Sequence, residues 1–203
     1  MIKNLFLIRH GLSLHNQKFK EMNYDVNAFR IPEVIDSPLI EEGQIQSIEL
    51  GKKWKEKESI ELILVSPLMR TLETVQNIFG DTNKKIICLE FLREYPIGRD
   101  TCNMRSDISV LKNKFPNIDF SNIKENKDIY WEKDEMDMET MVDLNNRIEY
   151  LKRYLMIQRE TNIAIVSHGS LIGKFKDNHI SLIENGDEEL QYCYPYEFKL
   201  TLN

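Results

Sequence analysis

The stretch Leu7-Ile8-Arg9-His10-Gly11 decides the fold prediction, because it places an arginine and a histidine directly after an apolar segment. Residues 5–8 are all apolar, and the run is too short for a helix and is bounded by Gly11, which predicts a buried strand. Open α/β folds bind their ligands where the chain leaves the carboxyl ends of the strands. We therefore expect Arg9 and His10 to lie at the binding edge of a sheet.

Three further short apolar segments are also followed by polar side chains. Residues 63–65 precede Ser66-Pro67 and Arg70, residues 86–89 precede Arg93-Glu94, and residues 163–166 precede Ser167-His168-Gly169. If all of these segments are parallel strands, their carboxyl ends meet at one edge of the sheet. The pattern predicts that residues far apart in the chain converge there.

The rest of the chain predicts an α/β fold. Apolar residues at helical spacing predict helices over 41–57, 69–79 and 138–159, the last with Asp137 as its N-cap, and residues 196–202 are a final candidate strand. Strands that alternate with helices predict a mainly parallel sheet covered on both faces. Residues 99–137 fit neither periodicity, and we expect an excursion over the sheet edge, either a substrate lid or a packed surface loop without substrate contacts.

Composition limits the class of protein. A chain of 203 residues predicts one domain, 1–203, and the net charge of −6 argues against a nucleic-acid binder. The absence of an apolar run of about 20 residues argues against a membrane span, and the short apolar start argues against a signal peptide. Three widely spaced cysteines favour neither a disulfide framework nor a zinc site, so a reducing, cytoplasmic compartment is expected.

Five motifs together resemble the histidine phosphatase superfamily, most closely its phosphoglycerate-mutase-like branch. In chain order they are Arg9-His10-Gly11 with Asn16; Asp36-Ser37-Pro38-Leu39 with Gly43 and Gln46; Ser66-Pro67 with Arg70-Thr71 and Glu73-Thr74; Leu92-Arg93-Glu94 with Gly98; and Ser167-His168-Gly169. They span residues 5 to about 170. The resemblance implies a three-layer α/β/α sandwich and a metal-independent phosphatase without a cofactor.

The residue chemistry agrees with a phosphohistidine mechanism. A neutral imidazole can attack phosphorus, and His10 is the candidate nucleophile beside Arg9. Gly11 would let the backbone approach the phosphoryl group. Guanidinium groups of Arg9 and Arg70 would hold the phosphoryl oxygens, since their paired donors match that geometry. An isolated histidine at a strand end would more simply be a cap.

The remaining roles come from the resemblance. His168 is implied as a second phosphate-contacting histidine, with Gly169 beginning a helix whose amides add an anion site. Asn16 matches a phosphate-binding position, although an asparagine there is also typical of a turn or helix cap. Glu94 is implied as the proton donor to the leaving alcohol, with Glu90 as its competitor.

Several alternatives stay open. Arg99 stands where the family often has a tryptophan, and with Arg105 it is a weaker candidate for substrate contact. His15 and His179 have no supporting context, and no His-x-x-x-His pair predicts a metal site. The expected partner is a small phosphorylated metabolite, not nucleic acid or membrane, and a homodimer is left open. The rival functions are a phosphoglycerate-mutase-type isomerase, a catalytically silent binder of phospho-ligands or proteins, and a phosphoprotein phosphatase.

Overall fold

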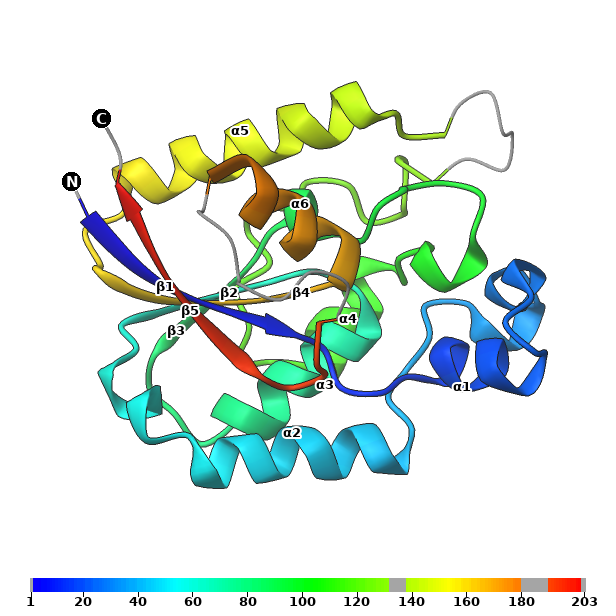
Figure 1. The fold of residues 1–203 in the computed structure, drawn as a ribbon, viewed down its shortest axis with the longest axis horizontal. Helices are drawn as coiled ribbons and strands as arrows, with labels where there is room; N and C mark the ends of the chain where they lie inside the picture. Colours follow the sequence, from blue (N-terminus) through cyan, green and yellow to red (C-terminus); the bar gives the residue numbers. More distant parts are fainter. Residues whose placement is uncertain (1, 132–137, 180–189, 202–203) are drawn as a thin grey trace.

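A five-stranded sheet forms the centre of the molecule (Figure 1). The computed structural model describes residues 2–131, 138–179 and 190–201. The strands are β1 (Ile2–Arg9), β2 (Leu62–Val65), β3 (Lys85–Cys88), β4 (Asn162–Ser167) and β5 (Pro195–Thr201). Their order is β3-β2-β4-β1-β5, and every neighbouring pair is parallel except β1 with β5. This confirms the prediction of a mainly parallel sheet.

Helices cover both faces of the sheet. α2 (Glu41–Lys53) and α3 (Met69–Phe79) lie on one face, and α5 (Met141–Ile157) and α6 (Gly169–His179) lie on the other (Figure 1). α1 (Leu14–Glu21) follows the carboxyl end of β1, and α4 (Ile108–Lys114) belongs to the long excursion. Short 3₁₀ helices are η1 (Val26–Phe29), η2 (Pro32–Val34), η3 (Lys55–Ser59), η4 (Glu90–Leu92) and η5 (Thr101–Asn103). The three-layer α/β/α arrangement is therefore confirmed.

Alternate residues of β1 build two separate cores. Phe6 and Ile8 pack with the α3 and α4 side chains, whereas Leu5 and Leu7 pack with those of α5 and α6. Successive side chains of a strand point to opposite faces, so a strand that is apolar throughout is what a doubly covered sheet requires. The polar residues that follow β1 are thereby held at a rigid edge.

Two helices are shorter than predicted. α2 ends at Lys53 because Trp54 leaves the helical conformation, and its side chain is buried against Phe6 and Phe79. α5 begins after Thr140, whose hydroxyl accepts from the amide of Asp143 while the Asp143 carboxylate accepts from the Thr140 amide. This capping box sets the start of the helix. Asp137, the predicted cap, lies outside the described residues.

The excursion from residue 99 is mostly part of the core. Leu111, Phe115 and Phe120 are buried with the α3 side of the sheet, and the amide of Asp119 donates to Ile86 O. The segment has no regular period because its apolar residues anchor short irregular turns. Of its described residues, those around Cys102 reach the sheet edge where the candidate site lies.

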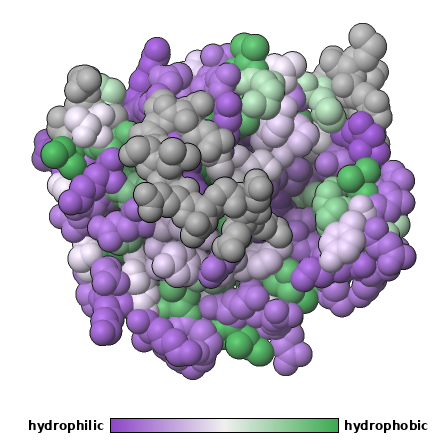
Figure 2. All heavy atoms as spheres, viewed as in Figure 1, coloured by the Kyte–Doolittle hydropathy of each residue, from purple (hydrophilic) through white to green (hydrophobic). Residues whose placement is uncertain are grey.

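The face in Figure 2 is mainly hydrophilic, with hydrophobic residues scattered over it. Among the described helices, none combines the length and the apolar character that a membrane crossing would need.

Candidate active site

Two histidines meet at the carboxyl ends of β1 and β4. The register pairs Arg9 with Ser167, and the amide of His10 donates to Ser167 O over 3.0 Å. The His10 and His168 ring centroids are 5.2 Å apart, and both residues are buried. Burial, and next the positive charge of Arg70, lowers the pKa of both imidazoles well below the usual value. Both rings are therefore neutral at pH 7.

The orientation of His10 is fixed by its neighbours. Its Nδ1 lies 2.7 Å from Gly11 O, and since a carbonyl oxygen only accepts, Nδ1 carries the hydrogen. The other nitrogen, Nε2, then holds a lone pair and accepts from Arg70 Nε at 3.2 Å. His10 thus presents an unprotonated nitrogen beside a guanidinium group, which is the arrangement that attack on an anionic electrophile requires.

His168 has one satisfied nitrogen and one without a partner. Its Nε2 lies 2.7 Å from the Ser66 hydroxyl, whereas its Nδ1 is buried and has no hydrogen-bond partner in the described part of the chain. An unsatisfied buried polar atom is costly, so a native site that keeps one needs an explanation. A bound anion that accepts from Nδ1–H would satisfy it.

Arg70 reaches the histidines because a strand and a helix meet at Ser66-Pro67. β2 ends before the pair, and α3 begins at Met69, whose amide donates to Asp36 Oδ1 over 2.8 Å. The buried guanidinium of Arg70 donates through Nη1 to Cys102 O (2.7 Å) and through Nη2 to Asn103 Oδ1 (2.8 Å). Its far side is anchored, and its Nε faces His10.

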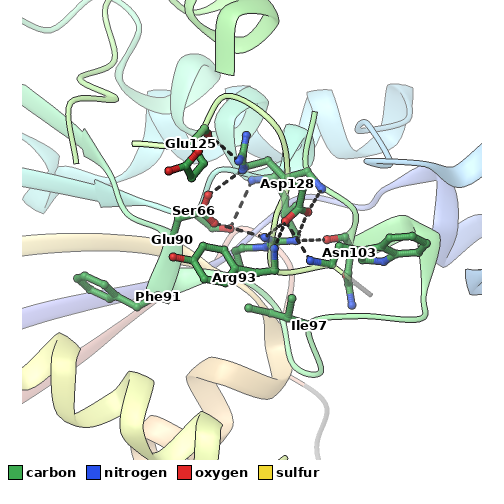
Figure 3. Close-up of polar contacts among 12 residues, drawn as sticks. Ser66, Glu90, Phe91, Arg93, Ile97, Asn103, Glu125 and Asp128 are labelled. Carbon is green, nitrogen blue, oxygen red and sulfur yellow. Dashed lines mark hydrogen bonds and ion pairs between the residues drawn. The ribbon is translucent and has the colours of Figure 1, made fainter. Parts of the chain in front are cut away.

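A buried ion pair supports that anchor (Figure 3). Arg93 donates to both carboxylate oxygens of Asp128, over 2.8 and 2.6 Å, and to Asn103 O over 2.6 Å. The side chains of Arg93 and Asp128 are 0% and 1% exposed. Burial alone would raise the pKa of Asp128, but the bonds to Arg93 outweigh it, and the pKa is lowered. The excursion therefore holds the turn that orients Arg70.

A cavity of about 250 Å³ opens in front of His10. Its described lining comes from four parts of the chain and consists of Arg9, His10, His15, Asn16, Phe19, Lys20, Tyr24, Phe29, Glu94, Tyr95, Asp100, Cys102, Asn103, Ser170 and Tyr192. Arg9 donates to Leu190 O (2.7 Å) and to the Tyr192 hydroxyl (3.0 Å). Asn16 Oδ1 accepts a hydrogen bond from the Ser13 hydroxyl at 2.6 Å. This bond uses the amide oxygen of Asn16, and the amide nitrogen remains its donor group.

The structure brings most of the predicted phosphate-contacting residues together. Arg9, His10 and Asn16 line the cavity, and Arg70 lies directly behind His10. Gly169 begins α6, and the next residue, Ser170, is part of the lining. The N-terminus of an eleven-residue helix thus lies at the cavity, where a helix N-terminus can bind an anion.

The two candidate acids occupy different places. Glu94 lines the cavity, with its Oε1 accepting from the Tyr95 amide at 2.8 Å. Glu90 is paired with Arg105 at 2.7 Å and with Arg93 at 3.4 Å, and it lies in a separate groove beside α5. The geometry favours Glu94 over Glu90 as a group that can reach a leaving alcohol.

The two weaker arginine candidates are not brought to the cavity. The Arg105 guanidinium donates to the backbone oxygens of Ser106, Glu125, Asn126 and Lys127. These bonds connect the beginning of the excursion to residues 125–127 of the same segment. Arg99 occupies a left-handed turn, with φ of 51°, and is absent from the described lining. The expected substrate contacts of both residues are therefore without geometric support.

Sequence reasoning missed several lining residues. His15 is buried with its ring centroid 6.0 Å from that of His10, and Phe19 and Phe29 form the wall beyond it. α1 carries no apolar period, so only the position of His15 next to Asn16 could have indicated its place. Gly11 was expected to admit the phosphoryl group, but a Cβ there would lie 2.5 Å from Gly43 O, so the glycine is required by backbone packing.

Metal and thiol chemistry have little support among the described residues. No group of three or more His, Cys, Asp or Glu side chains among them is arranged to hold a metal ion. Cys102 lines the cavity, but burial raises the pKa of its thiol to about 12, which keeps it protonated. His10 is therefore the better candidate nucleophile.

Comparisons with known proteins identify the family. The family model described as histidine phosphatase superfamily (branch 1) matches residues 5–175. The chain is 29% identical over 201 residues to phosphoglycerate mutase-like protein 1 of Arabidopsis thaliana, covering 84% of this chain and 69% of that protein.

Solved phosphatases share the fold. A phosphoserine phosphatase of Entamoeba histolytica, in complex with 3-phosphoglyceric acid, is 25% identical with a TM-score of 0.51, covering 84% of this chain and 76% of that one. The alpha-ribazole phosphatase of Shigella flexneri is 21% identical with a TM-score of 0.55, covering 83% and 75%.

Proposed function

Because the chain belongs to branch 1 of the histidine phosphatase superfamily, we propose that it is a metal-independent phosphatase acting on a small phosphorylated metabolite through a phosphohistidine at His10. One observation carries the proposal. His10 is neutral, its hydrogen is committed to Gly11 O, and its Nε2 lone pair faces the Arg70 guanidinium. The unpartnered Nδ1 of His168 supports an anion site at the same place.

In the first step the ester enters with its phosphoryl group between the two histidines. Its oxygens take the hydrogen bond that Arg70 Nε gives to His10 in the free protein, and they accept from His168 and Asn16. His10 Nε2 forms the N–P bond as the P–O bond to the alcohol breaks. The carboxyl of Glu94 donates its proton to the departing oxygen, so the alcohol leaves neutral.

In the second step water replaces the alcohol. The Glu94 carboxylate takes a proton from water, whose oxygen attacks phosphorus while the N–P bond breaks. Inorganic phosphate leaves, and His10 returns to its neutral form. The two half-reactions use the same in-line geometry and the same anion contacts.

Positive charge for the transferring group comes from the protein. Arg9 and the α6 N-terminus lie at the cavity, and Arg70 lies directly behind His10, in a chain whose net charge is −6. Preorganised donors in a site with little water stabilise developing charge without the reorganisation that solvent needs. This supports phosphoryl transfer by Arg9 and Arg70 without a metal ion.

The mutase alternative differs from hydrolysis in the group that accepts the phosphoryl group from the phosphohistidine, which is a second hydroxyl instead of water. A mutase must exclude water and return the phosphoryl group to another hydroxyl. Among the described lining residues Tyr24 is 68% exposed and Lys20 is exposed, so this side of the cavity opens to solvent. That opening supports hydrolysis. The intact set of catalytic and phosphate-contacting residues supports activity over silent binding.

The test is a panel of phosphomonoesters that includes 3-phosphoglycerate, assayed for inorganic phosphate and for 2-phosphoglycerate. We expect phosphate release, with the His10→Ala variant as the blank. Interconversion of the two phosphoglycerates without net phosphate would contradict hydrolysis and support the mutase. Tight phosphate-ester binding without any turnover would contradict both.

A further inference from the structure

The cavity beyond the phosphoryl end is lined by aromatic rings. From His10 the rings follow one another as His15, Phe29, Phe19 and Tyr24. The centroid distances are 6.0 Å for His10 to His15, 5.7 Å for His15 to Phe29, 4.8 Å for Phe29 to Phe19 and 5.3 Å for Phe19 to Tyr24. α1, η1 and the turn between them supply this row, and Tyr95 and Tyr192 add rings from other parts of the cavity lining. We call the outer four residues the aromatic wall.

His15 belongs to this wall as a ring and not as a charge. Burial, then the charge of Arg70, lowers its pKa well below the usual value, so the imidazole is neutral. Its Nδ1 lies 2.8 Å from the Ser13 hydroxyl, and its ring meets Phe29 edge to face. The wall thus continues without a cation from the nucleophile to Phe19.

Beyond Arg9, the charged side chains among the described lining residues are Lys20, Glu94 and Asp100. Asp100 lies 3.0 Å from Arg30, which balances it. Outside the phosphoryl end, Lys20 is the cation among the described lining residues, and its side chain is exposed to solvent. A leaving group with a carboxylate or a second phosphate would therefore meet apolar rings, two carboxylates and one screened lysine.

On these observations, and resting on the proposed function, we infer that the leaving alcohol carries a flat ring. The substrate class is aryl and arylalkyl phosphomonoesters, whose ring packs against the aromatic wall while the phosphoryl group reaches His10. Ring pairs at centroid distances of about 4.5–7 Å are favourable beyond the area they bury. The cavity volume of about 250 Å³ suits a single ring and a phosphate better than a large ligand.

The experiment compares esters whose leaving groups have the same basicity. Ethyl phosphate and 2-phenylethyl phosphate are both primary alkyl esters, so their kcat/KM ratio reports the ring and not the chemistry. We expect a ratio of about 10- to 100-fold in favour of the phenylethyl ester, from burial of one aromatic ring. Phe19→Ala should lose most of that ratio, and Phe19→Leu should lose about 2- to 10-fold, because it keeps apolar area without a ring.

Using a ratio cancels any general loss of folded protein or of catalysis. Tyr150→Ala is the matched control, because Tyr150 is 61% exposed on α5 and lies outside the cavity, and it should leave the ratio unchanged. Equal kcat/KM for both esters with normal phosphate release would overturn the inference and leave the proposed function standing. A preference for 3-phosphoglycerate that is lost in Lys20→Ala would also overturn it. No turnover of any ester would overturn both.

Discussion

Replacing Asp128 with alanine should strongly destabilise the fold. Its carboxylate is 1% exposed and accepts two bonds from Arg93, which is 0% exposed, and it also accepts from the amides of Arg105, Tyr130 and Trp131. Removing one partner of a buried pair costs about 3–5 kcal/mol, and Glu90, 3.4 Å from Arg93, compensates only part of the charge that remains. In a chain of 203 residues, that loss lowers Tm by about 10 °C.

Urea unfolding at pH 7 measures this loss directly, with Asp81→Ala as the control. Asp81 is an exposed aspartate beyond the end of α3, and its loss should stay within about 0.5 kcal/mol. The double variant Arg93→Met with Asp128→Leu should recover most of the stability, because it removes both charges together. A loss below about 1 kcal/mol for Asp128→Ala, or a double variant as unstable as the sum of its parts, would refute the reasoning.

The same pair predicts a dependence on pH. Because the pKa of Asp128 is lowered in the fold, its contribution is complete above the unfolded value of about 3.9 and is lost as pH falls through the folded pKa. Asp128→Ala should therefore differ most from the wild type near neutral pH, and the difference should shrink in acid. A difference that grows below pH 4 would contradict this sign.

Three further predictions follow from the site. In single-turnover measurements, Glu94→Gln should slow phosphoenzyme formation from an alkyl ester about 10²–10⁴-fold, and it should slow the same step less for p-nitrophenyl phosphate. Equal losses for the two esters would make Glu94 a binding residue, and Glu90 would be the next residue to test. Below pH 6.5 the unfolded chain binds protons that the neutral, folded His10, His15 and His168 do not, so the free energy of unfolding should decrease as the pH is lowered, by up to about 1.4 kcal/mol per pH unit for each histidine. His15→Gln should reduce that pH dependence in urea unfolding, and an unchanged dependence would argue against a neutral His15. Activity should survive EDTA and be inhibited by vanadate; loss in EDTA with recovery on adding a divalent ion would contradict charge supplied by arginines.

Local patterns account for what the sequence predicted well. Residues 5–8 are apolar on both faces of the strand, as a strand covered on both sides requires. His10 could therefore be placed at the edge of the sheet, just after this strand. His168 follows β4 in the same way. The meeting of the two histidines then depends only on parallel pairing, which the alternation of strands and helices already predicted.

Long-range partners account for what the sequence missed. Arg105 carries the same charge as Arg70, and nothing local distinguishes a phosphate ligand from a residue that binds the backbone oxygens of residues 125–127. Arg93 and Asp128 are separated by 35 residues without a shared periodicity. The ring row was also hidden, because Phe19 and Phe29 come from two short helices with few buried residues.

Trapping the phosphoenzyme tests the central claim most directly. The protein is mixed rapidly with a turned-over ester, quenched in alkali, and digested for mass spectrometry. The account predicts an acid-labile, alkali-stable phosphate on His10 of the wild type, and neither that phosphate nor turnover in His10→Ala. Phosphate on a serine or on another residue, or full turnover by His10→Ala, would contradict it.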